Sequence, residues 1–178
     1  MNMRTIALVG VLGGGIAVSP AGAQITKASV PGIVNFSSVE STVACAGATT
    51  PAAMAEVKRR GYASVVNLRQ ASERGADIEA GTAAAQAAGL HYIHLPFNSA
   101  SPDPTLIDRF LAAVTDPGNQ PAFIHCASAN RAAALWMVKR VQVDDWAIDR
   151  AATEAAELGL SSSGLKTLAL NYIEAHKK

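Results

Sequence analysis

The sequence contains few aromatic residues, few cysteines and almost no net charge. Phe, Trp and Tyr make up 5% of its 178 residues, and the two cysteines leave open one disulfide or two separate thiols. Lys and Arg number 15 against 14 Asp and Glu, and no low-complexity run or convincing repeat is present. Such a balance does not steer a protein toward nucleic acid or anionic lipid, so we expect neither as a partner.

The sequence has one long apolar run, at its N-terminus. It spans Ile6 to Val18, follows Arg4 and precedes the small residues 21–23. A basic start, a short apolar stretch and a small-residue site are typical of a secretory signal peptide, and the run is too short for a membrane span. We predict that residues 1–23 are a signal peptide cleaved after Ala23, which places the mature protein in the periplasm or outside the cell. An uncleaved N-terminal anchor is the alternative.

The remaining chain is the size of one domain with a single core. We expect an extended N-terminal arm over residues 24–35 and the domain itself over 36–178. Strand patterns alternate with helical ones, which predicts an α/β fold. We expect a central, mostly parallel sheet of four to five strands, flanked by helices on both faces. The expected strands lie within 36–45, 62–69, 91–97 and 121–125, and the expected helices within 50–61, 77–88, 105–114, 131–141, 145–158 and 162–175.

The stretch FIHCASANR, residues 123–131, connects the last expected strand to a helix. In a parallel sheet, ligands bind beyond the carboxyl ends of the strands, where this loop lies. Free N–H groups at the start of a helix attract an anion and favour the thiolate of Cys126, the nucleophilic form of cysteine. Arg131 supplies a planar fork for two oxygens of a phosphate or sulfate group. A buried cysteine with no chemical role is the alternative.

Four segments in this order, VVNLR, GLHYIHLPF, PTLIDRFLAAV and FIHCASANR, resemble the dual-specificity-phosphatase-like branch of the cysteine phosphatases. The chain is most similar to its bacterial DUF442 group, also called the β-lactamase-hydrolase-like phosphatase domain, over about residues 33–175. The resemblance implies a phosphatase fold and a phosphomonoester substrate, either a phosphorylated small molecule or a phosphoprotein. It implies no cofactor.

The resemblance also implies roles for individual residues. Cys126 would attack phosphorus and form a phosphocysteine, Arg131 would clamp the phosphate oxygens, and the cradle would be formed by Ala127, Ser128, Ala129 and Asn130. An aspartate from a neighbouring loop would protonate the leaving group, and Asp103 is the candidate; an ordinary loop aspartate beside prolines is its alternative role. We place His125 with the substrate-binding residues; its alternative role is to fix the base of the loop.

Three features of the loop keep other functions open. Four residues separate Cys126 from Arg131, a spacing that also resembles the persulfide loop of rhodanese-like sulfurtransferases. Ala129 stands where a glycine is common, and a positive φ there would cost about 1 kcal/mol. Ala132 replaces a common Ser or Thr. A sulfurtransferase and an anion-binding pseudophosphatase are therefore the alternatives to a phosphatase.

Other residues near the predicted site have simpler interpretations. Cys45 is either a disulfide partner of Cys126 or a small buried residue. Arg69 and Glu73 either form a surface ion pair or touch substrate. His91 and His94 point to opposite faces of one strand and cannot chelate one ion by themselves, so we predict no metal site.

Overall fold

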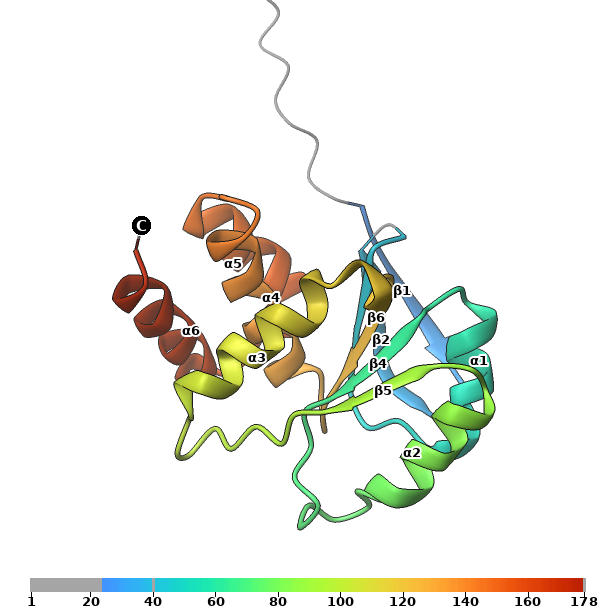
Figure 1. Ribbon diagram of the computed structural model, residues 1–178. Coiled ribbons are helices and arrows are strands. Elements are labelled where there is room, and N and C mark those ends of the chain that lie inside the picture. Colours follow the sequence, from blue (N-terminus) through green and yellow to red (C-terminus); the bar gives the residue numbers. More distant parts are fainter. Residues whose placement is uncertain (1–23, 40, 178) are drawn as a thin grey trace, which may run out of the picture.

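The chain forms one six-stranded sheet covered by helices on both faces (Figure 1). A computed structural model describes residues 24–39 and 41–177, so the predicted signal peptide lies outside the described residues. The strand order is β1-β2-β3-β6-β4-β5. The strands are β1 (Ile25–Val30), β2 (Ile33–Val39), β3 (Val43–Ala46), β4 (Ser64–Asn67), β5 (His91–His94) and β6 (Ala122–His125).

The four strands β3, β6, β4 and β5 are parallel, as predicted, and β1 and β2 extend the sheet as an antiparallel hairpin. Strand β6 lies between β3 and β4. In this central strand all four residues are buried, which explains its continuous apolar run. The residue that follows β6 therefore emerges near the centre of the sheet's carboxyl edge.

The N-terminal arm predicted over residues 24–35 is instead part of the sheet. It forms β1 and the start of β2, which raises the number of strands above the expected four to five. The hairpin turns at Pro31 and Gly32, where Gly32 has φ +77°. Proline followed by a residue with positive φ is the pairing of a type II turn, and this signal in the sequence indicates the hairpin.

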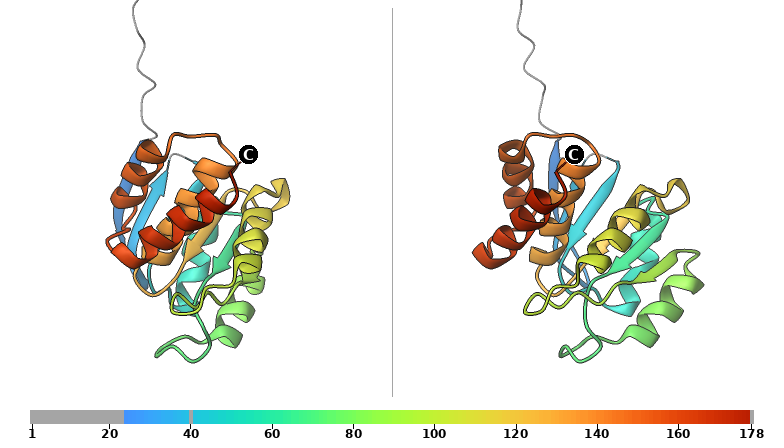
Figure 2. Two further views of the ribbon diagram at one scale, coloured as in Figure 1. Left: turned by 90° about the vertical axis from the view of Figure 1, so that its left-hand side faces the viewer. Right: turned by 60° about the vertical axis from the view of Figure 1, so that its left-hand side comes forward.

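The helices divide between the two faces, as Figure 1 and Figure 2 show. One face is covered by α1 (Met54–Arg59), which follows a short 3-10 turn at Pro51–Ala53, and by α2 (Ile78–Ala87). The other is covered by α3 (Pro104–Thr115), α4 (Asn130–Gln142), α5 (Ile148–Glu157) and α6 (Ser163–Ala175). In the described part of the chain, no helix combines the length and apolarity that crossing a membrane requires.

Helix α4 is enclosed on all sides over its first half. Residues 132–138 are all buried, between the sheet and helices α5 and α6. A helix that is apolar all round belongs in a core, which accounts for the alanine-rich sequence that follows Arg131. The start of α4 is consequently fixed relative to the end of β6.

Gly159, in the connection between α5 and α6, allows close packing against the loop that follows β6. It has φ +113°, and a β-carbon there would lie 3.2 Å from the β-carbon of Ala129. We expect Gly159→Ala to lower the free energy of unfolding by about 2 kcal/mol, because it combines backbone strain with a tight contact. Urea denaturation measures this loss.

Gly61 provides the matched control, since it has φ +92° and a β-carbon there would meet no atom within 4 Å. Gly61→Ala tests the backbone cost alone, and we expect a loss of about 1 kcal/mol. Equal losses for the two variants would show that the contact with Ala129 has no energetic weight.

Candidate functional site: the loop between β6 and α4

Cys126 begins the loop between β6 and α4, at the carboxyl edge of the sheet. Its side chain is 1% exposed, and its N–H donates to the carbonyl oxygen of Ala46 at 3.1 Å, which continues the pairing of β3 with β6. The free N–H groups at the start of α4 follow within a few residues and favour negative charge in the loop. The loop thus combines a buried thiol with an anion-attracting helix end.

Two neighbouring segments hold the loop from outside. The carbonyl oxygen of Ala127 accepts from the N–H of Ala48 at 2.9 Å, and that of Ser128 accepts from Asn35 Nδ2 at 3.3 Å. Gly47 lies so close that a β-carbon there would be 3.0 Å from the oxygen of Ala127. With both carbonyl groups held outward, the loop keeps one shape.

Ala129 adopts the backbone conformation anticipated from the sequence. It has φ +75°, is fully buried and caps α4. Asn130, the next residue, binds outward: its Oδ1 accepts from the N–H groups of Ser161 and Ser162, each at 2.8 Å. The sharp turn and this side-chain bridge join the loop to the start of α6.

Arg131 is held in one orientation by three residues from two other loops. Its Nη1 donates to the carbonyl oxygens of Leu68 and Phe97, each at 3.0 Å. Nη1 and Nη2 also donate to the two carboxylate oxygens of Glu73, at 2.6 and 2.8 Å. A guanidinium has five N–H donors, so this arrangement leaves the Nε edge for another acceptor.

Glu73 and Arg131 reinforce each other's charged forms. Burial alone would raise the pKa of Glu73, but its bonds to Arg131, to the backbone of Gln70 and to Arg69 lower that pKa from 4.5 to about 2. Burial likewise tends to lower the pKa of Arg131, but hydrogen bonding to Glu73 and the nearby Cys126 raise it. The pair is therefore fully ionised at neutral pH.

Replacing Glu73 with Gln tests this pair through the pH dependence of stability. A carboxylate whose pKa is lower in the folded state stabilises the fold above its unfolded pKa, and that contribution disappears as the pH falls through the folded value. We expect Glu73→Gln to lower the free energy of unfolding by about 2 kcal/mol at pH 7. The difference from wild type should shrink between pH 4.5 and about 2. Urea titrations across this range measure it, and a difference independent of pH would contradict the assignment.

Arg69 and Glu73 do form an ion pair, but the prediction that this pair lies at the surface is wrong. Arg69 is 5% exposed, and its guanidinium also donates to the carbonyl oxygens of Arg74 and Gly75, at 2.7 and 2.9 Å. Its Nε lies 3.4 Å from Glu73. Arg69 thereby fixes the loop that carries Glu73, and the acid pairs more closely with Arg131. The sequence could not show this because β4 and β6, whose loops meet here, are far apart in the chain.

An open cavity of about 390 Å³ lies over the loop. It brings together residues from four segments: Gln70, Glu73, Ser99, Ala127, Ser128, Asn130, Arg131, Ser162 and Leu165. Four of these belong to the predicted cradle and clamp, and Glu73 is a residue for which contact with substrate was one of two interpretations. Gln70, Ser99, Ser162 and Leu165 were not predicted. The lining is polar and small, and no aromatic side chain belongs to it.

Four predicted site residues do not line this cavity: Cys126 and Ala129 are buried within the loop itself, and Asp103 and His125 lie elsewhere. Asp103 caps α3, where its Oδ1 accepts from the N–H and hydroxyl of Thr105 at 2.9 and 2.8 Å, and it does not line the cavity. His125 is 2% exposed and neutral, because burial and the charges of Arg69 and Arg131 lower its pKa to about 3. Its ring packs beside Phe123, on the sheet face opposite to that of Cys126, since adjacent strand residues point to opposite faces. Neither ring nitrogen of His125 has a hydrogen-bond partner among the described residues, so the structure does not show it fixing the base of the loop through a hydrogen bond.

Cys45 occupies the core under the loop. It pairs with Ile124 in register and shares a sheet face with Cys126, the first residue after β6. Both thiols are free, and burial raises the pKa of Cys45 well above its ordinary value. The placement agrees with the interpretation of Cys45 as a small buried residue.

A ring nitrogen of each histidine in β5 lies within hydrogen-bond distance of a polar atom. His94 Nε2 lies 2.8 Å from the carbonyl oxygen of Arg69, and His91 Nδ1 lies 3.3 Å from Asn119 Oδ1. Within residues 24–39 and 41–177, no group of three or more His, Cys, Asp or Glu side chains is placed to hold a metal ion.

Comparison with known proteins identifies the family. The family described as beta-lactamase hydrolase-like protein, phosphatase-like domain, matches residues 35–143, which is more than half of the chain. The chain belongs to this family. The match confirms the resemblance seen in the sequence, and it includes β6, the loop and α4. A comparison with curated protein sequences finds no match.

Solved structures share the fold of this phosphatase-like domain. A putative phosphatase (DUF442) from Shewanella putrefaciens CN-32 has a TM-score of 0.68 and 18% identity, over 82% of this chain and 95% of that one. TpbA from P. aeruginosa has a TM-score of 0.65 and 21% identity, over 88% and 91%. The core catalytic domain of the PP-IP phosphatase SIW14 from S. cerevisiae has 0.67 and 17%, over 83% and 91%.

Proposed function

We propose that this protein hydrolyses phosphomonoesters through a phosphocysteine formed on Cys126. The observation that carries the proposal is the orientation of Arg131. Its Nη1 and one N–H of Nη2 are committed to Glu73 and two carbonyl oxygens, which leaves the Nε N–H and the second N–H of Nη2 available beside Cys126. An arginine fixed this way offers two parallel N–H donors to a tetrahedral oxyanion next to a thiol.

The chemistry follows from this arrangement in two steps. The thiolate of Cys126 attacks phosphorus, the bond from phosphorus to the ester oxygen breaks, and the alcohol leaves with a proton. Water then attacks the phosphocysteine, which releases phosphate and restores the thiolate. Arg131 and the N–H groups at the start of α4 stabilise the charge on the equatorial oxygens in both steps.

Asp103 can supply the proton for the leaving group only after a local movement. It lies in the loop between β5 and α3, but its carboxylate caps α3. For Asp103 to act, that cap must open when substrate binds. Without an acid, the leaving group must depart as an anion, so aryl phosphates should be turned over better than alkyl phosphates.

Similar proteins are linked to two kinds of substrate. A second structure of TpbA is a complex with pTyr, and SIW14 is a PP-IP phosphatase. For this chain we propose a phosphorylated small molecule or a phosphoprotein. The cavity has no aromatic side chain to stack on a phenol ring.

Parallel assays on the reduced protein test the proposal. An aryl phosphate reports phosphatase activity, and thiosulfate with cyanide reports sulfur transfer, since a persulfide on Cys126 would yield thiocyanate. Phosphate release that depends on Cys126 supports the proposal. Thiocyanate formation without phosphate release would assign a sulfurtransferase, and neither product would leave an anion-binding protein without turnover.

We further propose that residues 1–23 direct export and are removed after Ala23. The motif of the N-terminal segment supports this. After expression in a Gram-negative host, protein recovered from the periplasm should have the intact mass of a chain that begins at Gln24. Full-length protein confined to the membrane fraction would favour the anchor instead.

A further inference from the structure

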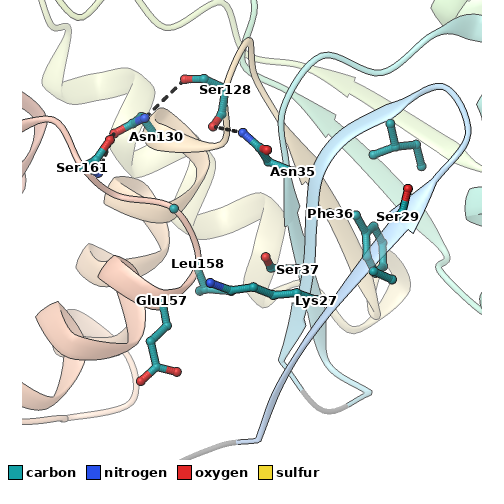
Figure 3. A pocket seen from close by; sticks show the side chains of 13 residues that line it. Lys27, Ser29, Asn35, Phe36, Ser37, Ser128, Asn130, Glu157, Leu158 and Ser161 are labelled. Carbon is teal, nitrogen blue, oxygen red and sulfur yellow. Dashed lines mark hydrogen bonds between the residues drawn. The ribbon is translucent and has the colours of Figure 1, made fainter.

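A second cavity lies on the other side of the same loop, between the β1–β2 hairpin and the connection from α5 to α6 (Figure 3). Its volume is about 670 Å³, larger than that of the cavity over Arg131. Ser128 and Asn130 line both cavities. A ligand with its phosphate at Arg131 can therefore continue into the second cavity without leaving the loop.

At this cavity the sheet face changes from apolar to polar side chains. Ile25 pairs with Val39, and both pack into the core that lies under α5 and α6. The next pair on the same face is Lys27 with Ser37, and both line the cavity. This stretch of the face is polar and no helix packs on it, yet it is recessed, since Ser37 is only 5% exposed. A recessed polar surface of this kind can bind a ligand.

The lining combines apolar side chains, among them Ile33, Phe36 and Leu158, with side chains that both donate and accept hydrogen bonds. Ser29, Ser37 and Ser128 contribute hydroxyl groups, whereas the amides of Asn35 and Asn130 are bonded to neighbouring residues of the protein. Hydroxyl groups complement both the N–H and the C=O groups of a peptide backbone, since they donate and accept hydrogen bonds. The two cavities together are too extended for a small phosphate ester to fill.

Lys27 and Glu157 are the two charged side chains in the lining of the cavity. The side chain of Lys27 crosses the cavity toward Leu158, whereas the carboxylate of Glu157 points away (Figure 3). Among the described residues Lys27 has no ion-pair partner. A lysine without a partner in a polar cavity complements an acidic group on the ligand.

We propose that this cavity is a second substrate subsite, which binds the segment next to the phosphorylated residue of a peptide and recognises an acidic side chain through Lys27. The proposal rests on the proposed function, since it takes the phosphate to be bound at Arg131. It identifies the substrate as an acidic phosphopeptide.

Binding to a Cys126→Ser variant tests the subsite without turnover. Fluorescence anisotropy would compare phosphoserine peptides of about nine residues that carry either Glu or Gln near the phosphoserine. We expect the Glu peptides to bind roughly three- to fivefold more tightly at low salt, the range of one exposed ion pair. Lys27→Ala should reduce this ratio to about one, and Lys27→Glu should reverse it.

Lys166 provides the matched control, because it is exposed and lines none of the cavities near the loop. Lys166→Glu should leave the Glu-to-Gln ratio as it is in the parent protein. The proposal is overturned if Lys27→Glu leaves the ratio unchanged or if Lys166→Glu lowers it equally. It is also overturned if only a small molecule with two anionic groups, such as a phosphorylated hydroxy acid, shows the Lys27 dependence.

The same measurements separate this proposal from the proposed function. Acid-selective peptide binding that depends on Lys27, combined with no hydrolysis of aryl phosphate by the Cys126 protein, would retain the subsite and reject the phosphatase. Hydrolysis of aryl phosphate with no acid selectivity would do the reverse.

Discussion

Replacing Cys126 with serine is expected to lower kcat/KM for an aryl phosphate by about 10⁴-fold or more. A serine hydroxyl remains protonated at neutral pH and is a poor nucleophile without an adjacent base. His125, the nearest histidine in sequence, faces away from the loop, and the interior lowers its pKa to about 3. The variant should still bind inorganic phosphate, because Arg131 and the helix end are unchanged. Steady-state kinetics and phosphate titration measure the two properties separately.

Cys45 offers a matched control for this experiment. It is the other buried thiol and lies on the same sheet face, but it belongs to β3 and not to the loop between β6 and α4. Cys45→Ala should keep kcat/KM within about threefold of wild type while it lowers stability by about 1 kcal/mol through the lost packing. Activity that survives in Cys126→Ser, or falls equally in Cys45→Ala, would contradict the assignment of the nucleophile.

Replacing Arg131 with lysine is expected to lower kcat/KM by about 10²- to 10³-fold. An ammonium group is a compact charge and cannot contact Glu73 and two oxygens of a phosphate in one plane. It also leaves the carbonyl oxygens of Leu68 and Phe97 without their shared donor. Unlike Cys126→Ser, this variant should lose affinity for inorganic phosphate. Phosphate titration followed by kinetics on an aryl phosphate distinguishes the two defects.

Arg140 allows a control with the same chemistry at a remote place. Its guanidinium forms a two-pronged contact with Glu154 at 2.7 and 3.1 Å, on the far part of α4. Arg140→Lys should lower stability without a comparable loss of phosphate affinity. If both arginine variants lose activity in proportion to stability alone, the role of Arg131 as a phosphate clamp is refuted.

The sequence predicts the central elements because each has a local signal. The buried run before Cys126, the small residues after it and the apolar residues beyond Arg131 indicate a strand, a tight loop and a core helix, and the structure has all three. The partners of Arg131 have no such signal. Glu73 reaches it only because β4 lies beside β6, a neighbour relation that the order along the chain does not reveal.

Asp103 illustrates a local signal that favours a different role. It precedes Pro104, and an aspartate before a proline at the first helical position is typical of a helix cap. The structure has that cap, so a role in proton transfer depends on movement. The hairpin at Pro31 and Gly32 likewise has a readable turn signal. Its first strand, β1, lies at the edge of the sheet with only Val30 fully buried, so it lacks the apolar run that identifies a strand from sequence.

The bridge from Asn130 to Ser161 and Ser162 makes two amide protons into reporters for the loop between β6 and α4. Both protons are bound to one side-chain oxygen, and that side chain belongs to the loop that encloses the proposed phosphate site. Any ligand that tightens or opens the loop must change these two bonds. Their exchange with deuterated solvent therefore measures occupancy of the site from a position that the substrate itself need not contact.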